Sequence, residues 1–254
     1  MTPAYQAIPK YLAKEGYQNP SKNAPFNMAY NTDLPVFEWR KHNPENAKAG
    51  QTFMAAQRMG QRSVWDGRVP MNDFALSDND KSNDRVVFCD VGGGFGHQCM
   101  DLRKHNPQIQ GRFVTQDLEL VNNMIANKDE LTTLGIETMP HDFMSVQPVK
   151  NAKVYYLRNV IHNWQDEPSK VILSHIWEAM AEDSIVIVDD VVMPKTHATW
   201  KQTSMDIAMM TMLAAVERTA DHFQRLLGEV GLKIRDIWTY DDEFGDSFIV
   251  AVPA

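Results

Sequence analysis

The chain has 254 residues, which is long enough for one large domain or for one domain with a small appendage. Its 33 acidic side chains outnumber its 25 basic ones, the net charge is -8 and the pI is about 5.5, and this balance argues against a nucleic-acid partner. No apolar run approaches the roughly 18 residues that a membrane span needs, so the sequence also argues against a membrane protein.

The N-terminus and the cysteines indicate a cytoplasmic location. The first residues, MTPAYQAIPKYLAKEG, lack the apolar core of a secretory signal. Cys89 lies in a predicted strand and Cys99 in the helix predicted after it. Two cysteines so placed argue against a disulfide framework and favour a reducing compartment.

Residues 1–80 differ in amino-acid composition from the rest of the chain, because they are polar and Pro, Asn and Lys are scattered through them. Short helices are predicted at residues 7–14, 34–42 and 47–65. The charged loop DNDKSNDR, from Asp78 to Arg85, marks a boundary. We therefore expect a helical connector over residues 1–80 and an α/β domain over residues 81–254.

From Val86 onward, strand-like and helix-like segments alternate. Strands are predicted at residues 86–90, 112–116, 136–139, 154–157, 185–189, 232–240 and 247–252. Helices are predicted at residues 97–105, 118–127, 168–181, 200–213 and 220–230. Such alternation predicts a mostly parallel, seven-stranded sheet with helices on both faces. The last two strands are joined by a short turn, which only an antiparallel pair permits, so one strand is expected to be reversed.

The stretch VVFCDVGGGFG, from Val86 to Gly96, predicts a nucleotide-type ligand site. An apolar strand runs into an acid and then into Gly92, Gly93 and Gly94, and glycine allows a tight turn and a close approach of a ligand to the backbone. The helix predicted next offers unpaired N–H groups at its start. An ordinary tight turn between a strand and a helix is the alternative.

Two acids narrow the choice of nucleotide. The NAD fingerprint G-x-G-x-x-G is not met, because His97 stands at its third glycine position, and no Gly-Lys-Ser/Thr follows as in a P-loop. Asp90 precedes the glycines and Asp117 ends the next strand. These carboxylates suit a cationic amino group and a ribose diol, both of which S-adenosylmethionine (SAM) carries. After the third strand, Asp142 could accept from an adenine amine and Phe143 could stack on the ring, although Asp is also common in plain turns.

His162 follows the fourth strand, where catalytic groups gather in parallel sheets, and histidine is a natural general base near neutral pH. Asp190 ends the fifth strand, and Glu217 precedes the helix predicted from Ala220. A carboxylate beside a histidine orients its ring and stabilises its protonated form. The alternatives are a structural histidine, a solvated strand end and an acid that favours a helix dipole.

Met205, Ala208, Met209 and Met212 share one face of the helix predicted at residues 200–213. Methionine lines adaptable apolar pockets, and it packs equally well in a core. The eight histidines are dispersed and the acidic turn at residues 241–246 is typical of a solvated hairpin loop, so no metal site is expected.

Five segments together carry a resemblance to a known family: DVGGGFG, HDF, LRNVIHNWQDE, IVIVDDVVMP and ERTADHFQRLLGEVGL. In this order, and over about residue 5 to the C-terminus, the sequence resembles the fungal branch of the plant-caffeate-type O-methyltransferases. The resemblance implies a class I, Rossmann-like methyltransferase fold, SAM as methyl donor and a small hydroxylated acceptor of secondary metabolism, often aromatic.

The resemblance also implies roles for individual residues. Those implied to hold the cofactor are Gly92, Gly93 and Gly94 at its methionine end, Asp117 at the ribose, Asp142 and Phe143 at the adenine, and Arg158 nearby. Those implied to move the proton are His162 as base, with Asp190 and Glu217 beside it. Those assigned to the acceptor pocket are Trp164, Met205, Met209 and Met212. Many relatives carry Lys in place of Arg158, and relatives often carry Glu in place of Asp190, whose shorter side chain weakens its expected contact with the imidazole.

One departure from the family is larger. Relatives begin with a winged-helix-like region of about a hundred residues that builds a dimer, whereas PKYLAKEGYQNP and LPVFEWRKHNP resemble the connector after it. The expectation is a short form or fragment in which homodimerisation is possible but weakened. Two other functions stay open: a SAM-binding enzyme that promotes dehydration or a pericyclic reaction without methyl transfer, and a catalytically inactive partner protein.

Overall fold

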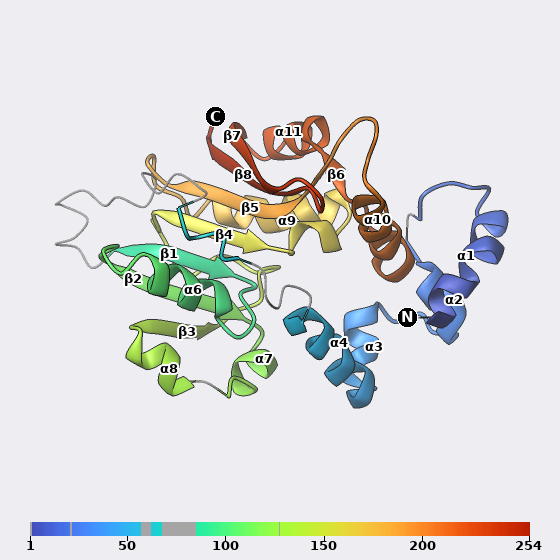
Figure 1. The fold of residues 1–254 in the computed structure, drawn as a ribbon, viewed down its shortest axis with the longest axis horizontal. Coiled ribbons are helices and arrows are strands. Elements are labelled where there is room, and N and C mark those ends of the chain that lie inside the picture. The colour runs from blue at the N-terminus through green and yellow to red at the C-terminus, as the bar shows by residue number, and fades with distance from the viewer. Residues whose placement is uncertain (1, 21, 57–61, 68–84, 127) are drawn as a thin grey trace.

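A mostly parallel β-sheet forms the centre of the structure (Figure 1). The computed structural model describes residues 2–20, 22–56, 62–67, 85–126 and 128–254. The strands are β1 (Val86–Val91), β2 (Arg112–Asp117), β3 (Ile136–Pro140), β4 (Val154–Arg158), β5 (Ile185–Met193), β6 (Arg218–Thr219), β7 (Leu232–Asp241) and β8 (Asp246–Pro253).

The strand order is β3-β2-β1-β4-β5-β8-β7, with β6 beside the end of β5. Strands β1 to β5 pair in parallel, and β8 is antiparallel to both β5 and β7. This confirms the predicted sheet with one reversed strand. The order changes direction between β1 and β4, and ligands of such sheets bind outside the strand ends at that point.

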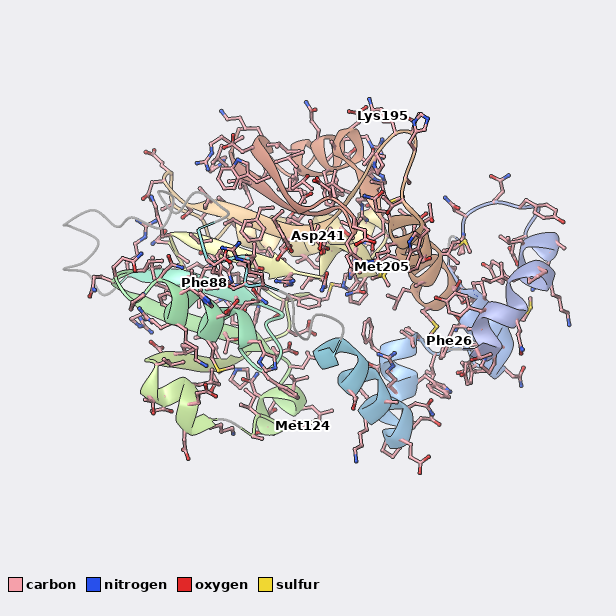
Figure 2. All side chains as sticks on the ribbon, in the orientation of Figure 1. Phe26, Phe88, Met124, Lys195, Met205 and Asp241 are labelled. Carbon is pink, nitrogen blue, oxygen red and sulfur yellow. The ribbon has the colours of Figure 1, made fainter. Side chains whose placement is uncertain are left out.

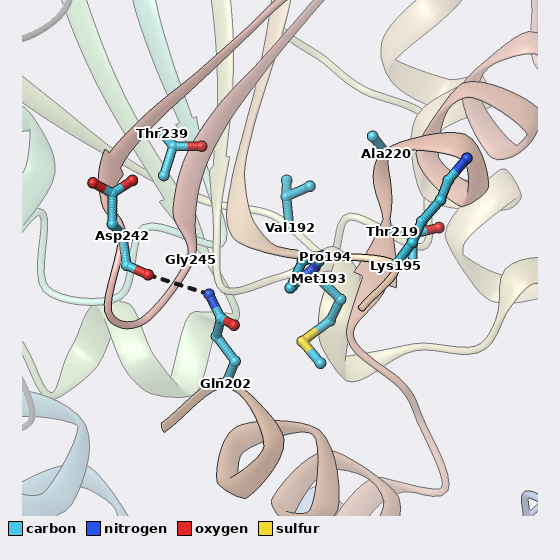
Figure 3. A pocket seen from close by; sticks show the side chains of 10 residues that line it. All are labelled: Val192, Met193, Pro194, Lys195, Gln202, Thr219, Ala220, Thr239, Asp242 and Gly245. Atoms are coloured by element: carbon cyan, nitrogen blue, oxygen red, sulfur yellow. Dashed lines mark hydrogen bonds between the residues drawn. The ribbon is translucent and has the colours of Figure 1, made fainter. Parts of the chain in front are cut away.

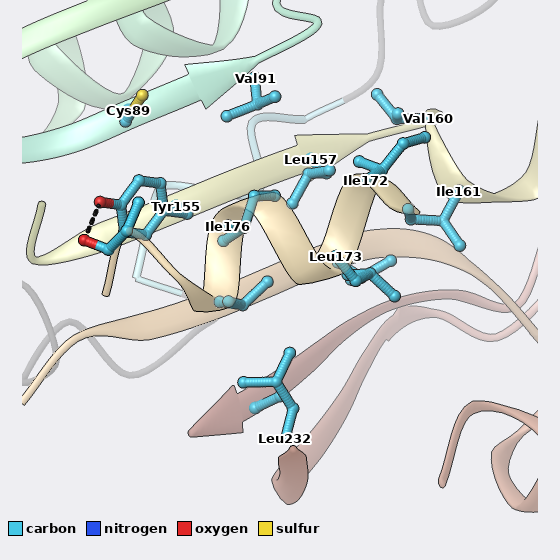
Figure 4. Packing of buried hydrophobic residues seen from close by; sticks show 14 of the residues in the cluster. Cys89, Val91, Tyr155, Leu157, Val160, Ile161, Ile172, Leu173, Ile176 and Leu232 are labelled. Carbon is cyan, nitrogen blue, oxygen red and sulfur yellow. Dashed lines mark hydrogen bonds between the residues drawn. The ribbon is translucent and has the colours of Figure 1, made fainter. Parts of the chain in front are cut away.

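Helices cover both faces of the sheet because successive strand residues point to opposite sides. On one face, Tyr155 and Leu157 pack with residues of α9 (Asp166–Trp177) and α11 (Ala220–Gly228) (Figure 4). On the other face, Val154 and Tyr156 belong to a cluster with residues of α6 (His97–His105) and α8 (Lys128–Thr133). The short helix α7 (Glu119–Asn123) follows β2.

A group of helices lies beside the sheet at the right of Figure 1, on the side of α10. Its members are α1 (Thr2–Lys14), α2 (Pro25–Tyr30), α3 (Val36–Lys41), α4 (Pro44–Ala56) and α10 (Trp200–Leu213). A small apolar cluster that includes Ala4, Phe26, Val36 and Ala214 joins α1, α2 and α3 to the end of α10. Among the described helices, none is both long and apolar enough to cross a membrane.

The predicted helices differ from the structure in several places: α1 begins at Thr2 and not at residue 7, α9 ends at Trp177 and not at residue 181, and α2 was not predicted. The helix predicted at residues 47–65 ends by Ala56, and residues 62–67 lie outside any helix; residues 57–61 lie outside the described residues. The segment at residues 118–127 forms the shorter α7, with α8 after it. Nearly all of the predicted boundary loop at residues 78–85 also lies outside the described residues, so the division at residue 80 stays a prediction.

Trp65 explains why the connector does not simply continue as a helix. Its indole is fully buried against Phe88, Tyr156 and Phe248 of the sheet, and its Nε1 donates to Gln98 Oε1 at 3.0 Å. The burial of so large a ring outweighs the helical propensity of the segment.

Replacing Trp65 with alanine is expected to lower the free energy of unfolding by about 3–5 kcal/mol, because it removes a buried aromatic side chain and leaves a cavity. Urea unfolding measures this change. Trp200→Ala is the control, since Trp200 is 70% exposed and its loss should change stability by no more than about 0.5 kcal/mol. Equal effects of the two substitutions would contradict the packing role of Trp65.

Candidate functional site

The glycine turn after β1 is built around a buried acid. Gly92 and Gly94 have φ angles of 73° and 59°, the left-handed region that favours glycine. A Cβ atom on Gly93 would lie 2.5 Å from the carboxyl group of Asp90 and from Thr115 Oγ1. The Asp90 carboxyl therefore forms the floor beneath the turn, and only a residue without a side chain fits above it.

Asp117 and Phe143 flank this turn, as the sequence predicted for a cofactor site. Asp117 Oδ2 accepts from the backbone N–H of Gly94 at 2.8 Å. A Cβ atom on Gly92 would lie 3.4 Å from the ring of Phe143. Asp142 is exposed, and its Oδ1 accepts from the backbone N–H of Met144 at 2.9 Å. The structure thus brings the glycines, Asp117 and Phe143 together, with Asp142 next to them in the chain.

Burial and the nearby charges raise the pKa of Asp90, the acid beneath the turn. Burial is the main reason why the pKa of Asp90 is raised to about 7, the charge of Asp117 adds to this effect, and Arg158 opposes it. Arg158 ends β4 and lies 3.3 Å from Asp189 Oδ2. The predicted cofactor residues therefore form one electrostatic group with an excess of acid, which suits a positively charged ligand.

His162 lies on a short 3-10 turn, Ile161–Asn163, directly after β4. Its ring atom Nδ1 is 2.9 Å from Glu217 Oε1, while its backbone N–H donates to Asp190 Oδ2 at 3.1 Å. Both carboxylates predicted to flank His162 are thus beside it, and all three side chains are buried. Only Glu217 bonds the ring, whereas Asp190 holds the backbone of the turn.

The acids on both sides of His162 favour its protonated form. Burial alone lowers the pKa of the imidazole, but the charges of Glu217 and Asp190, together with the hydrogen bond to Glu217, outweigh burial and raise that pKa to about 9. On a carboxyl group burial has the opposite effect, and it raises the pKa of Asp190 to about 7, although the charge of His162 opposes this shift. The arrangement stabilises an imidazolium, which is the product of general-base catalysis by histidine.

Arg218 holds the turn in place, and the sequence analysis did not identify it. It is fully buried, and its guanidinium donates to the carbonyl of Ile161 at 3.0 Å and to the carbonyl of Trp164 at 2.7 Å. It also donates to Asp166 Oδ1 from Nε at 3.1 Å and from an Nη at 3.0 Å. Because Arg218 follows Glu217 directly, two adjacent residues supply the ring partner of His162 and the hydrogen bonds that hold its backbone turn.

The residues predicted for the acceptor pocket are less closely grouped. The Trp164 ring meets the Phe143 ring edge-on at 6.1 Å, so Trp164 borders the predicted adenine side. Met212 packs on the apolar cluster of the N-terminal helices. Met205, which Figure 2 labels on α10, and Met209 are half-buried on the same helix.

A cavity of about 330 Å³ lies at the end of β5, away from these residues (Figure 3). Val192, Thr219 and Gly245 contribute to its lining, and Gln202 reaches across it to the carbonyl of Asp242 at 3.3 Å. No predicted site residue lines it. Within the described part of the chain, no group of three or more His, Cys, Asp or Glu side chains is placed to hold a metal ion.

Replacing Arg218 with lysine is expected to lower the free energy of unfolding by about 1–3 kcal/mol, because an ammonium group cannot reach both carbonyls and Asp166 and leaves buried acceptors unpaired. Chemical denaturation provides the measurement. Arg225→Lys is the matched control, since Arg225 is mostly exposed and meets Asp166 at 3.6 Å without carbonyl bonds. A loss no larger than that of the control would show that Arg218 does not hold the turn.

Comparison with known proteins shows the family of this chain. A family model described as an O-methyltransferase domain matches residues 11–233. Demethylsterigmatocystin 6-O-methyltransferase of Aspergillus parasiticus is 35% identical over 253 residues, which cover 99% of this chain and 63% of that protein. The chain thus spans about three fifths of the length of the curated relatives it matches.

Two solved structures are similar over nearly the whole chain. A structure titled "A Pericyclic Reaction enzyme" has a TM-score of 0.87 at 30% identity, and a structure of LepI in complex with SAM has a TM-score of 0.85 at 30% identity. Each comparison covers 99% of this chain and 64% of the other. The match of the family model and the identity to curated relatives show that the chain belongs to the O-methyltransferase domain family.

Proposed function

We propose that the chain carries out SAM-dependent methylation of a hydroxyl group on a small, aromatic or polyketide-like secondary metabolite, with His162 as the general base. The observation that carries this proposal is the buried pair of His162 and Glu217 at the strand ends, close in the fold to the glycine turn. A structural histidine does not need two buried carboxylates that stabilise its charged form.

The residues at the glycine turn fit SAM. A Cβ atom on Gly94 would meet no atom within 4 Å, so this part of the turn faces open space where a ligand can approach the backbone. Asp117 would hold the ribose hydroxyls and Phe143 would contact the adenine, while a bound sulfonium and ammonium group would favour the ionised forms of Asp90 and Asp117. When bound, SAM supplies an electrophilic methyl group.

The protein's own residues move the proton. Glu217 Oε1 holds Nδ1 of His162, and no hydrogen bond from the described residues reaches Nε2. Nε2 is therefore the atom that takes the proton from the acceptor hydroxyl and leaves an oxyanion as nucleophile. Glu217 and Asp190 stabilise the imidazolium as it forms, and Arg218 keeps the turn from shifting. General-base catalysis of this kind contributes roughly 10²–10⁴-fold to the rate.

A second function is favoured by one comparison. The structure titled "A Pericyclic Reaction enzyme" has the same fold at 30% identity, and O-methyltransferase lepI of Aspergillus flavus is 32% identical over 94% of this chain. Such an enzyme would bind SAM but use its charge without transferring the methyl group. Product mass separates the two functions, because only methyl transfer adds a methyl group and releases S-adenosylhomocysteine.

The proposed function is tested first by calorimetric titration of the 254-residue chain with SAM and S-adenosylhomocysteine. Micromolar binding of both is expected. Incubation with SAM and a panel of phenols should then give methylated products, and His162→Ala should lower turnover by at least roughly 100-fold while leaving SAM affinity nearly unchanged. Equal turnover of wild type and His162→Ala would remove His162 from the mechanism, and failure to bind SAM would overturn the proposal.

The pH dependence tests the role of Glu217. A base must be neutral, so kcat/KM of the wild type should rise with pH until His162 loses its proton, at a pKa of about 9 in the free chain. In Glu217→Gln the raising charge is gone and burial dominates, so the acid limb should move by at least about one pH unit toward lower pH. The plateau should fall, since Gln cannot stabilise the imidazolium.

Glu229→Gln is the matched control for this profile, because Glu229 is exposed and pairs with Lys170 and not with His162. Its profile should coincide with that of the wild type. An unmoved acid limb in Glu217→Gln would show that another group titrates.

A further inference from the structure

A cavity of about 200 Å³ lies among the N-terminal helices and α10. Phe26, Tyr30 and Trp39 line it and pack against one another, with ring centroids 4.8–5.4 Å apart. Phe26 lies on α2 in the neighbourhood of α10 and α3 (Figure 2), and Met212 of α10 closes another side. Such a wall of aromatic rings offers a planar apolar molecule a large contact area.

Arg40 is the charged residue among those that line this cavity, and within the described part of the chain its guanidinium has no hydrogen-bond or ion-pair partner. Of the nine arginines that the structure describes, the other eight each have a hydrogen bond or an ion pair through the side chain; they are Arg62, Arg85, Arg103, Arg112, Arg158, Arg218, Arg225 and Arg235. Arg40 is half-buried, and burial lowers its pKa with no acid to offset the effect. A partly desolvated cation at an aromatic cavity is complementary to an anion.

Gly50 holds the guanidinium at the cavity. A Cβ atom on Gly50 would lie 2.9 Å from Arg40 Cζ and 3.1 Å from one of its terminal nitrogens. The flat guanidinium therefore rests directly on the backbone of α4. Glycine inside a helix costs roughly 1 kcal/mol relative to alanine, and a close approach of this kind is the usual reason for one.

The cavity is connected to the candidate active site through α3. Phe37, one turn before Arg40, stacks on Trp164 with ring centroids 6.5 Å apart, and Trp164 lies two residues after His162. Helix α10, which supplies Met212, also contacts the turn that carries His162. The helix that carries Arg40 and the turn that carries His162 are therefore in direct contact through Phe37 and Trp164.

We propose that this cavity binds an aromatic carboxylic acid, with its ring on Phe26, Tyr30 and Trp39 and its carboxylate paired with Arg40. We further infer that this acid is the methyl acceptor, and only that part of the proposal rests on the proposed function. Arg40 then determines specificity, since it favours acidic acceptors over neutral molecules of the same shape.

The test measures binding of 6-hydroxy-2-naphthoate and of its methyl ester to the 254-residue chain by fluorescence titration. The two probes share the ring and the hydroxyl and differ in the negative charge. The acid should bind at least tenfold more tightly than the ester. Arg40→Gln should weaken binding of the acid about tenfold and leave the ester unchanged. Arg40→Lys keeps the positive charge but lacks the two parallel N–H donors of a guanidinium, so its affinity for the acid should lie between those of the wild type and Arg40→Gln.

Two further variants separate charge from shape. In Gly50→Ala the new methyl group displaces the guanidinium, so binding of the acid should weaken while the ester is unaffected. Trp39→Leu removes part of the aromatic wall and should weaken both probes. Urea unfolding of each variant confirms that the fold is retained.

Equal affinity of the wild type for the two probes, no binding of the acid at millimolar concentration, or an equal loss of both probes in Arg40→Gln would overturn the proposal. Titration with SAM is measured in parallel. If SAM does not bind but the discrimination between acid and ester persists, the proposed function fails and the cavity assignment stands. The reverse result refutes the cavity assignment alone.

Discussion

The hydrogen bonds of Arg218 are the constraint on which the candidate site depends. A short 3-10 turn cannot fix its own shape, because it has few internal hydrogen bonds. The buried guanidinium of Arg218 supplies the missing donors to Ile161 and Trp164, on both sides of His162. Glu217, the residue directly before the two-residue strand β6, lies against the imidazole, so neighbouring residues of one segment fix both the orientation of the ring and the position of its backbone.

Two electrostatic groups meet along the strand ends, and each has a buried acid that resists ionisation. Asp90 lies beneath the glycine turn, and Asp190 lies beneath the turn of His162. Arg158 of β4 lies between them in the order of the strands and is paired with Asp189 of β5. A cation near these acids is stabilised in a part of the molecule where water is largely excluded, which makes the interaction stronger than at the surface.

The sequence was sufficient for most of the sheet because the central strands β1, β4 and β5 begin with short, buried apolar runs. Observed β1, β2 and β4 begin at the predicted residues and extend one residue past the predicted ends. The predicted site residues at strand ends lie close together in the structure because parallel strands bring their carboxyl ends to one edge. Strand β6 has only two residues, too few for any periodic pattern, and the sequence did not reveal it.

Buried side chains with distant partners also could not be predicted. Arg218 reads as an ordinary surface arginine at a helix start, because its acceptors lie more than 50 residues earlier in the chain. Trp65 was placed in a helix because its aromatic partners belong to three different strands. The cavity beside Arg40 is formed by N-terminal helices together with α10, which is far from them in the sequence, so only the folded arrangement shows which of the described arginines has no hydrogen-bond or ion-pair partner.

Asp166 helps to hold the His162 turn in place, and it titrates at a lower pH than His162 does. At the start of α9, this carboxylate accepts from Arg218 and His222 and lies near Arg225. Burial acts to raise its pKa, but these bonds outweigh burial and lower it. The clamp on the turn therefore stays charged in acid solutions where His162 has long been protonated. In acid the base of such a site would be protonated while the pair of Arg218 and Asp166 stayed charged, so a return to higher pH would restore the base on a turn that this pair still holds.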